Sequence, residues 1–324
     1  MSTKMAVLCV GFAITLAACS GDTTTATSPQ SAPTSQGGNL PVQVSLVNYE
    51  LLANESNRFL VGLILPDNRL VAYGTVQMRF QGIGADGQPA GTASEAATGT
   101  YLPVPGTKVG DYSADPQAIS PATVRGVYEL EGVEFGTAGT WAVQVAARVE
   151  DYGVVQGTAT FEVLDAPRVP GVGEPAPASD NAVIGDDVAS VEIDSRAQNG
   201  VDIPDPDLHA VSIADAIDRG QPTVIVFSTP VYCQSRFCGP VTDMVSDLER
   251  KYGDEASFIH VEVWKDFETS TANDAAAEWL FRDGDLTEPW LFMLDEDGRI
   301  AARWDNLFTE AELEEGLTEL LGAA

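Results

Sequence analysis

The chain has 324 residues, which is enough for two domains of ordinary size, each with its own core. A hydrophobic content of 44% and an aromatic content of 8% are typical of a globular protein and exclude a disordered one. Acidic residues number 48 against 17 basic ones, for a net charge of -31. Because such a surface repels phosphate groups, we expect no nucleic-acid partner.

The first 18 residues are predicted to be a signal peptide. Lys4 supplies a positive charge, and the apolar run from Met5 to Leu16 is too short to span a bilayer. The run ends in Leu16-Ala17-Ala18-Cys19, which resembles the lipobox of bacterial lipoproteins. The resemblance implies that Cys19 receives a diacylglyceryl group, which would anchor the protein on the extracytoplasmic face of the cell membrane. The alternative is an ordinary secretory signal in which this Cys occurs by chance.

Two segments are predicted to be linkers. Residues 19–40 are rich in Thr, Ser, Pro, Gln and Gly and show no apolar periodicity, so they are predicted to form a flexible tether. Residues 166–185 begin with four prolines within fourteen residues. Proline-rich segments are semi-extended, and this one is predicted to separate two domains.

Residues 41–165 show a period of two, which predicts strands with one buried and one wet face. Val42, Val44 and Leu46 illustrate it, and the segments around Phe59, Val76 and Trp141 repeat it. About seven such strands, with no helical stretch between them, predict an antiparallel β-sandwich. The segment 126–141 loosely resembles immunoglobulin-like modules of exported bacterial proteins. Without a His, Cys or paired-carboxylate constellation, the region is interpreted as a spacer or partner-binding module.

The periodicity changes in residues 186–324. Apolar runs predict strands at 224–227, 258–263 and 290–294, with a hairpin continuing to 304. Helical spacing predicts helices at 213–219, 240–252, 275–281 and 310–321, two of them with capping residues at Ser212 and Thr309. This alternation predicts an α/β layer fold.

The same region resembles the thioredoxin superfamily. Phe237-Cys238-Gly239-Pro240-Val241 is similar to the family's Trp-Cys-Gly-Pro-Cys signature, with Val in place of the last Cys. Glu288-Pro289-Trp290 is similar to its cis-proline loop. The resemblance implies a thioredoxin-like fold in which Pro289, with Glu288 and Trp290, contacts the substrate. The sequence departs from the family in its four residues between Cys233 and Cys238, where thioredoxins have two, and in lacking the buried acid that would align near Val226.

Cysteine usage points to the pair Cys233 and Cys238, because Cys9 would leave with the signal peptide and Cys19 would carry lipid. Export would place this pair in a compartment that permits disulfides. A thiol at a helix N-terminus has a lowered pKa, and Cys238 directly precedes the helical pattern. We therefore predict Cys238 as the nucleophile and Cys233 as the resolving thiol.

The sequence thus predicts a membrane-anchored thiol–disulfide oxidoreductase. Its expected partners are extracytoplasmic protein thiols or disulfides and a redox partner. The N-terminal lipid is expected to attach the protein to the membrane. Two alternatives stay open: a non-catalytic binding or scaffold lipoprotein with a structural Cys233–Cys238 disulfide, or metal binding by the pair. Neither a cofactor nor a metal is predicted, and His260, in an apolar run, is interpreted as a core histidine.

Overall fold

The structure is a computed structural model that describes residues 40–107, 114–122, 125–233 and 235–323. The predicted signal peptide, the lipidation site Cys19 and almost all of the predicted tether lie outside the described residues. Residues 39–324 form one compact unit. Among the described residues, the helices are too short or too polar to cross a lipid bilayer.

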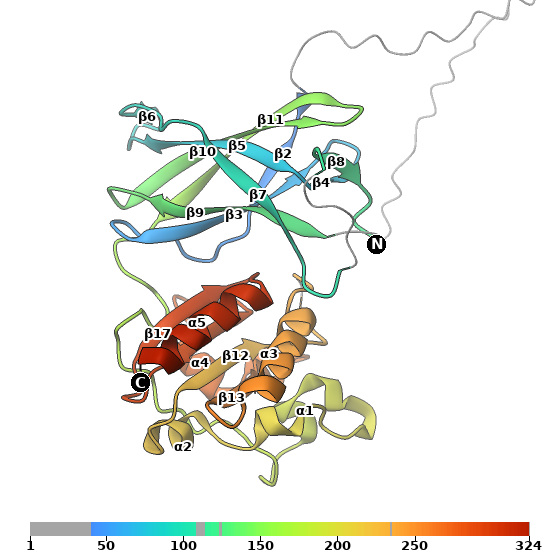
Figure 1. Cartoon of the computed structure of the whole chain (residues 1–324), viewed down its shortest axis with the longest axis vertical. Coiled ribbons are helices and arrows are strands. Elements are labelled where there is room, and N and C mark those ends of the chain that lie inside the picture. The colour runs from blue at the N-terminus through green and yellow to red at the C-terminus, as the bar shows by residue number, and fades with distance from the viewer. Residues whose placement is uncertain (1–39, 108–113, 123–124, 234, 324) are drawn as a thin grey trace, which may run out of the picture. The chain divides into compact units, whose positions relative to one another are not determined.

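Eleven strands form one large sheet (Figure 1). Its order is β1-β11-β10-β5-β7-β9-β3-β4-β8, with β2 beside β3 and β6 beside β5. The strands are β1 (Leu40–Pro41), β2 (Gln43–Leu46), β3 (Ser56–Ile64), β4 (Leu70–Ala72), β5 (Thr75–Ile83), β6 (Pro89–Ala90), β7 (Ala97–Pro103), β8 (Gln117–Ile119), β9 (Gly126–Glu134), β10 (Gly139–Val149) and β11 (Gly153–Val163).

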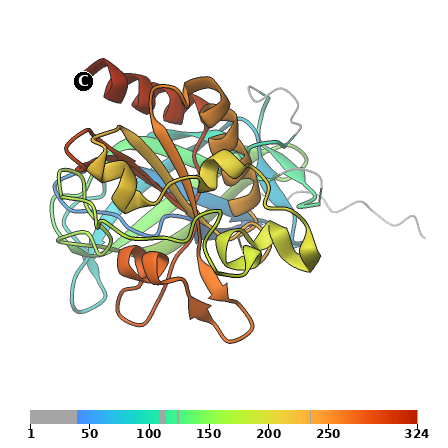
Figure 2. The same cartoon turned by 90° about the horizontal axis from the view of Figure 1, so that it is seen from below.

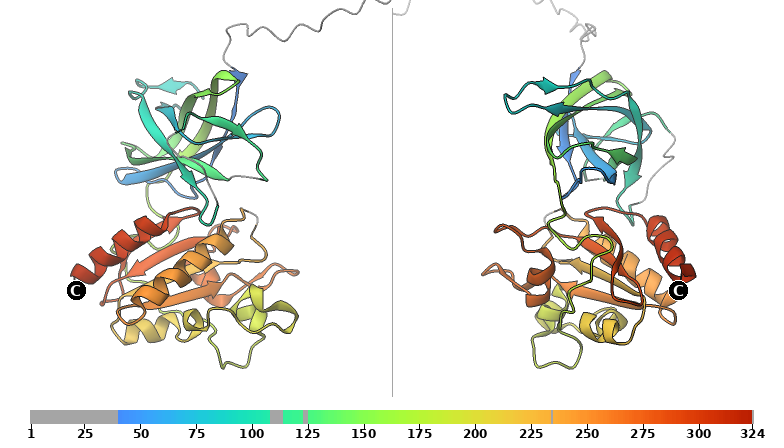
Figure 3. Two further views of the ribbon diagram at one scale, coloured as in Figure 1. Left: turned by 45° about the vertical axis from the view of Figure 1, so that its right-hand side comes forward. Right: turned by 90° about the vertical axis from the view of Figure 1, so that its left-hand side faces the viewer.

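The large sheet is curled, as Figure 3 shows. β1 runs parallel to β11, while β2, which follows it directly, runs antiparallel to β3. The first strands therefore connect two strands that lie far apart in the sheet order. Alternate side chains point inward and include an aromatic cluster in which the rings of Phe59 and Phe80 lie 4.8 Å apart and those of Phe59 and Phe161 lie 5.1 Å apart.

The predicted immunoglobulin-like β-sandwich is wrong. Its strands exist, but they belong to one curled sheet and not to two layers packed face to face. A period of two shows that one face of a strand is buried. It does not show what covers that face, which can be a second sheet or, as here, the opposite side of the same curled sheet.

The rest of the chain contains a smaller sheet with the order β13-β12-β16-β17 and a short pair, β14-β15. Most of its predicted helices and strands are found within a few residues of their expected places. The elements are α1 (Ser190–Ile193), η1 (Ser195–Gly200), η2 (Pro206–His209), α2 (Ile213–Asp218), β12 (Thr223–Ser228), α3 (Cys238–Tyr252), β13 (Ser257–Glu262), β14 (Trp264–Asp266), β15 (Thr271–Ala272), α4 (Asp274–Leu280), β16 (Trp290–Leu294), β17 (Ile300–Asp305) and α5 (Glu310–Ala323).

Helices lie against the smaller sheet (Figure 2). α3 and α5 pack on one face through residues such as Val245 and Leu317, and α2 and α4 pack on the other through residues such as Ile213 and Trp279. Val226 and Leu291 of the sheet are fully buried beneath α3 and α5. This packing fixes the position of the N-terminus of α3, where the cysteine pair lies.

The predicted fold class is nevertheless wrong for the chain. It paired a sandwich with an α/β thioredoxin-like fold, whereas the structure is mostly β, about 20% helical and dominated by the curled sheet. Even in the smaller sheet, β12 and β13 are the one parallel pair; β12–β16 and β16–β17 are antiparallel. Segment patterns fix the type of each element but not the direction in which strands pair, and an α/β class depends on that direction.

The proline-rich segment pairs with the chain at the start of β17. The Gly173 N–H donates to the Ile300 carbonyl at 2.8 Å, and the Ile300 N–H donates to the Glu174 carbonyl at 2.9 Å. The Ala176 N–H then donates to the Gly298 carbonyl at 2.9 Å, and Val169 is buried in the core of the smaller sheet. The segment is therefore held in place along its first half. The proposed domain boundaries on either side of it stay a prediction.

Residues of the large sheet also contact the C-terminal part of the chain. Arg58 of β3 forms ion pairs with Glu129 at 2.6 Å and with Glu312 of α5 at 2.9 Å. Leu307 is fully buried among residues of the large sheet, including Leu60 and Val127. These contacts combine apolar burial with a partly buried ion-pair network, so the two sheets are joined by specific packing.

Candidate functional site at the N-terminus of helix α3

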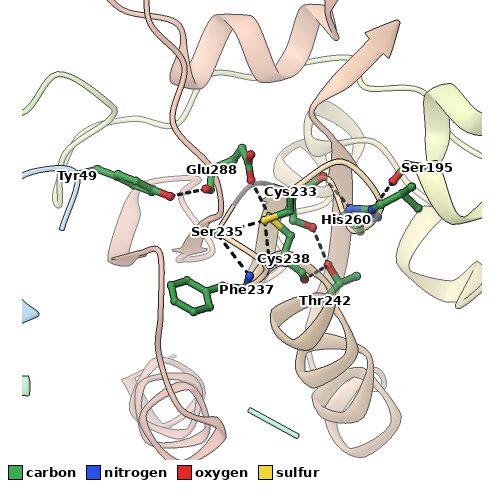
Figure 4. Close-up of a disulfide and its surroundings, with 11 residues drawn as sticks. Tyr49, Ser195, Cys233, Ser235, Phe237, Cys238, Thr242, His260 and Glu288 are labelled. Carbon is green, nitrogen blue, oxygen red and sulfur yellow. Dashed lines mark hydrogen bonds between the residues drawn. A yellow bond between two sulfur atoms is a disulfide. The ribbon is translucent and has the colours of Figure 1, made fainter. Parts of the chain in front are cut away.

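A disulfide joins Cys233 and Cys238, whose Cα atoms are 6.0 Å apart (Figure 4). Cys233 is held at the end of β12 by its N–H, which donates to the Thr229 carbonyl at 3.0 Å. Arg236 takes a left-handed conformation, with φ of 66°. This backbone turn reverses the chain, and the two sulfur atoms meet although four residues separate them.

The two cysteines differ in their exposure to solvent. Cys238, the first residue of α3, is 0% exposed, whereas Cys233 is half-buried. The Cys238 N–H lies 3.4 Å from Cys233 Sγ, and the Ser235 hydroxyl lies 3.2 Å from the same sulfur. The amide end of α3 therefore points at the sulfur of Cys233.

The carboxyl group of Glu288 faces the buried sulfur, with Oε2 2.7 Å from Cys238 Sγ. Burial, and after it the charge of Glu262, raise the pKa of Glu288 to about 8. A neutral carboxylic acid at this position can donate its hydrogen to a sulfur that carries none, as in the disulfide. The site thus brings a proton donor into contact with the inner sulfur.

Pro289 follows the residue that contacts the inner sulfur, and Trp290 packs in the core. The Glu288–Pro289 bond is cis, and the Pro289 carbonyl accepts a hydrogen bond from the Asn306 N–H at 2.9 Å. Trp290 is 2% exposed; its ring lies 5.9 Å from that of Tyr49 and its Nε1–H donates to Thr287 Oγ1. Of the predicted substrate contacts, Glu288 touches the disulfide, Pro289 is joined to Glu288 by a cis bond, and Trp290 is a core side chain.

Tyr49 is a site residue that sequence reasoning missed. Its hydroxyl donates to the Glu288 carbonyl, and its backbone N–H donates to an Asp305 carboxylate oxygen. Burial, and then the charges of Glu288 and Asp305, raise the pKa of Tyr49, so the phenol keeps its proton. Tyr49 lies between β2 and β3, more than 180 residues before the cysteines, and no local pattern connects the two regions.

Glu262, at the end of β13, is linked to the cysteine loop through Ser195. It is 1% exposed, and its Oε2 accepts the Ser195 N–H at 2.8 Å. Ser195 Oγ in turn accepts the Val231 N–H at 3.2 Å, two residues before Cys233. Burial raises the pKa of Glu262. Glu262 therefore affects the site through Ser195 and through its charge on Glu288.

No protein-family model matches the chain, and no curated protein matches it. One similar solved structure is Spo0M, a sporulation control protein from Bacillus subtilis, at 11% identity and a TM-score of 0.22. The match covers 40% of this chain and 51% of that chain, so the chain spans about half the length of the structure it matches. A likeness this weak carries no argument about fold or function.

These findings correct the predicted membership of the thioredoxin superfamily and the predicted immunoglobulin-like module. No family model supports either, and the chain is mostly β, with one large curled sheet and few helices. The short motifs that suggested thioredoxin, Cys238-Gly239-Pro240 and Glu288-Pro289, are present in the sequence. A few residues at the start of a helix and before a strand describe a local geometry and do not establish a family.

Proposed function

We propose that the protein is a thiol–disulfide oxidoreductase whose redox centre is the Cys233–Cys238 pair. The observation that carries the proposal is the asymmetry of the pair. One sulfur is partly exposed and faces the amide end of α3, and the other is buried against a carboxyl group with a pKa of about 8. An inert disulfide requires neither arrangement.

The exposures support Cys233 as the attacking sulfur and Cys238 as the resolving one, the reverse of the roles expected from the sequence. A sulfur from another molecule reaches Cys233 at the surface, but Cys238 is fully buried. The Cys238 N–H and the positive end of the α3 dipole stabilise a thiolate on Cys233. Helix position alone suggested Cys238, because the sequence does not show which sulfur the amides face.

In the proposed reaction the Cys233 thiolate attacks one sulfur of a substrate disulfide. A bond forms between the Cys233 sulfur and that sulfur, and the other substrate sulfur leaves as a thiolate, which takes a proton from solvent. Cys238 then loses its proton and attacks the Cys233 sulfur, which releases the second substrate thiolate. The substrate gains two electrons and the cysteine pair loses two. Run backwards, the same steps oxidise a dithiol.

Glu288 is proposed as the proton carrier for Cys238. Its carboxylate accepts the thiol proton when Cys238 attacks, and its acid form returns a proton when the disulfide is reduced. A group with a pKa of about 8 populates both forms near neutral pH, which suits both directions. The 2.7 Å between Glu288 Oε2 and Cys238 Sγ places the two atoms within reach for direct transfer.

The competing proposal is a disulfide that only braces the loop. A disulfide that closes so short a loop stabilises the folded chain by only about 2 kcal/mol through the lower entropy of the unfolded chain. The reduction potential separates the two. We expect a value above about -300 mV, and a value well below it, in the range of inert structural disulfides, would rule the redox proposal out.

Cysteine variants test the assigned roles. Cys238→Ser should trap a mixed disulfide between Cys233 and a disulfide probe such as oxidised glutathione, detected as a mass increase. Cys233→Ser should abolish exchange. Thr318→Ala, on the exposed face of α5, serves as the matched control and should exchange at the parent rate. A Cys233→Ser chain that still exchanges at the parent rate would contradict the roles.

We also propose that the chain is exported and anchored through Cys19. The proposal is supported by the apolar run at residues 5–16 and by Leu16-Ala17-Ala18-Cys19 after it. Mass spectrometry of the mature protein from a bacterial host should find a new N-terminus at Cys19 that carries a diacylglyceryl group. Cleavage without lipid would support the proposed export and contradict the proposed lipid anchor.

A further inference from the structure

Two histidines and an aspartate converge on one point in the interior. Asp194 lies between α1 and η1, His209 ends η2, and His260 lies within β13. His209 Nε2 is 3.3 Å and His260 Nδ1 is 3.5 Å from the same carboxylate oxygen, Asp194 Oδ2. All three side chains are at most 1% exposed. Three separate elements thus deliver donor atoms to one buried point.

The hydrogen-bond partners of the His260 ring show which of its two nitrogens carries a hydrogen. Its Nε2 lies 3.2 Å from the Ser228 carbonyl, which can only accept, so Nε2 carries the hydrogen. In the neutral ring Nδ1 then carries a lone pair. Within the described residues Nδ1 has no hydrogen-bond partner, although a carboxylate oxygen of Asp194 lies 3.5 Å away. Two lone pairs facing each other in a dry interior need a positive charge between them.

The surrounding charges leave room for a cation. The Arg196 guanidinium pairs with three carboxylates, at 2.7 Å from Asp194, 3.0 Å from Asp205 and 3.3 Å from Asp243. Asp205 is partly exposed and Asp243 is exposed to solvent, which screens their charges, so Asp194 is the fully buried carboxylate of the three. Asp194 accepts hydrogen bonds from the Arg196 guanidinium at 2.7 and 3.1 Å, which favour the anionic form of its carboxyl group.

We propose that Asp194 Oδ2, His209 Nε2 and His260 Nδ1 bind a zinc ion. Ligand atoms bound at ~2.1 Å to a tetrahedral ion lie ~3.4 Å apart, and the two measured separations are 3.3 and 3.5 Å. Two imidazoles and one carboxylate form a donor set that zinc accepts. Two of the three ligands also have fitting outer contacts, since His260 donates to a backbone carbonyl and Asp194 accepts from a guanidinium, whereas His209 Nδ1 has no hydrogen-bond partner among the described residues.

The ion would brace the cysteine loop from the interior. Ser195 follows Asp194 directly, and its hydroxyl accepts the Val231 N–H of the loop. His260 is bonded to the Ser228 carbonyl at the end of β12, and Ser228 Oγ lies 2.6 Å from Thr242 Oγ1 in α3. The zinc site therefore connects β13, β12 and α3 without touching either sulfur, and it is independent of the proposed redox function.

The test uses the full chain with both cysteines of the disulfide replaced, Cys233→Ser/Cys238→Ser. This chain removes a competing metal site, because Cys233, Cys238 and Glu288 also cluster. After chelation and return of Zn²⁺, elemental analysis should find one zinc per chain in it, as in the parent. His209→Ala in the same background should weaken zinc binding by more than the roughly 10–100-fold typical of outer-contact variants. Loss of zinc with the cysteines, or retention in His209→Ala, would overturn the proposal.

A spectroscopic measurement keeps the test valid if His209→Ala does not fold. Co²⁺ added to the Cys233→Ser/Cys238→Ser chain should produce the visible absorption bands of a four-coordinate nitrogen and oxygen site, and Zn²⁺ should remove them. If no bands form and proton NMR instead shows a doubly protonated His260 ring at pH 7, then a proton and not a metal occupies the gap, and the proposal is wrong. Neither readout depends on thiol exchange.

Discussion

The hydroxyl group of Tyr49 donates a hydrogen bond to the backbone carbonyl of Glu288, the residue whose side chain contacts the inner sulfur (Figure 4). The loop between β2 and β3 thereby reaches the cysteine site of the C-terminal part. The region that sequence reasoning treated as a spacer holds one wall of the candidate redox centre in place.

Tyr49→Phe should therefore affect both stability and the site. Losing this hydrogen bond leaves a partly buried carbonyl without its donor and should lower the free energy of unfolding by about 1 kcal/mol, measured by urea denaturation. Tyr252→Phe is the control, because its hydroxyl bonds Glu314 at the surface and its loss should cost less. Equal losses in the two variants would contradict the specific role of Tyr49.

Glu288→Gln should change the pH dependence of thiol exchange. In the parent, attack by Cys238 should accelerate as pH rises through about 8, where the carboxylate that accepts its proton forms. The amide cannot accept that proton, so the variant should lose this inflection and slow by roughly 100-fold or more, a typical contribution of a general base. Stopped-flow measurement of release from a mixed disulfide checks this. An unchanged pH profile in Glu288→Gln would remove Glu288 from the mechanism.

The same carboxyl group predicts how stability varies with pH. Burial and the charge of Glu262 raise the pKa of Glu288 from 4.5 to about 8 in the folded protein, so between these values the folded chain binds a proton that the unfolded chain releases. Its contribution to stability is fully present below pH 4.5 and is lost as pH rises through about 8. Urea midpoints of the oxidised protein should fall over this range, and less steeply in Glu288→Gln. Parallel curves would contradict the assignment.

Leu307→Ala tests the contact between the large sheet and the C-terminal part. Leu307 is fully buried in a cluster with Leu60 and Val127, so the truncation should lower the free energy of unfolding by about 2–5 kcal/mol. The control is Leu321→Ala near the end of α5, which is only partly buried. A cost below about 1 kcal/mol at Leu307 would mean that this cluster contributes little to holding the two parts together.

Local patterns in the sequence were sufficient for individual elements. The apolar run at 224–227 became β12, the helical spacing after Cys238 became α3, and Ser212 caps α2 by accepting the Asp215 N–H. Proximity of Cys233 and Cys238 also followed from the sequence, because only four residues lie between them. These features depend on residues that are close in the chain, and such residues interact in the same way in many folds.

Long-range pairing was not accessible from a single sequence. β3 pairs with β9 across roughly seventy residues, and β1 with β11 across more than a hundred, and no period records which strands become neighbours. The sandwich was therefore the wrong assembly of correctly placed strands. His260 was interpreted alone, as a core histidine, for the same reason: only the packing of η2 against β13 brings His209 beside it.

Residues 173–176 affect how readily the protein should aggregate at high concentration. An outer strand with unpaired amides and carbonyls is a template on which β-rich chains stack into aggregates. Here the backbone at the start of β17 is already hydrogen-bonded to this segment, and Pro175, opposite Arg299, has no N–H to offer another strand. Together with the strong mutual repulsion of acidic surfaces, this closed edge should keep neighbouring molecules separate even when they are crowded.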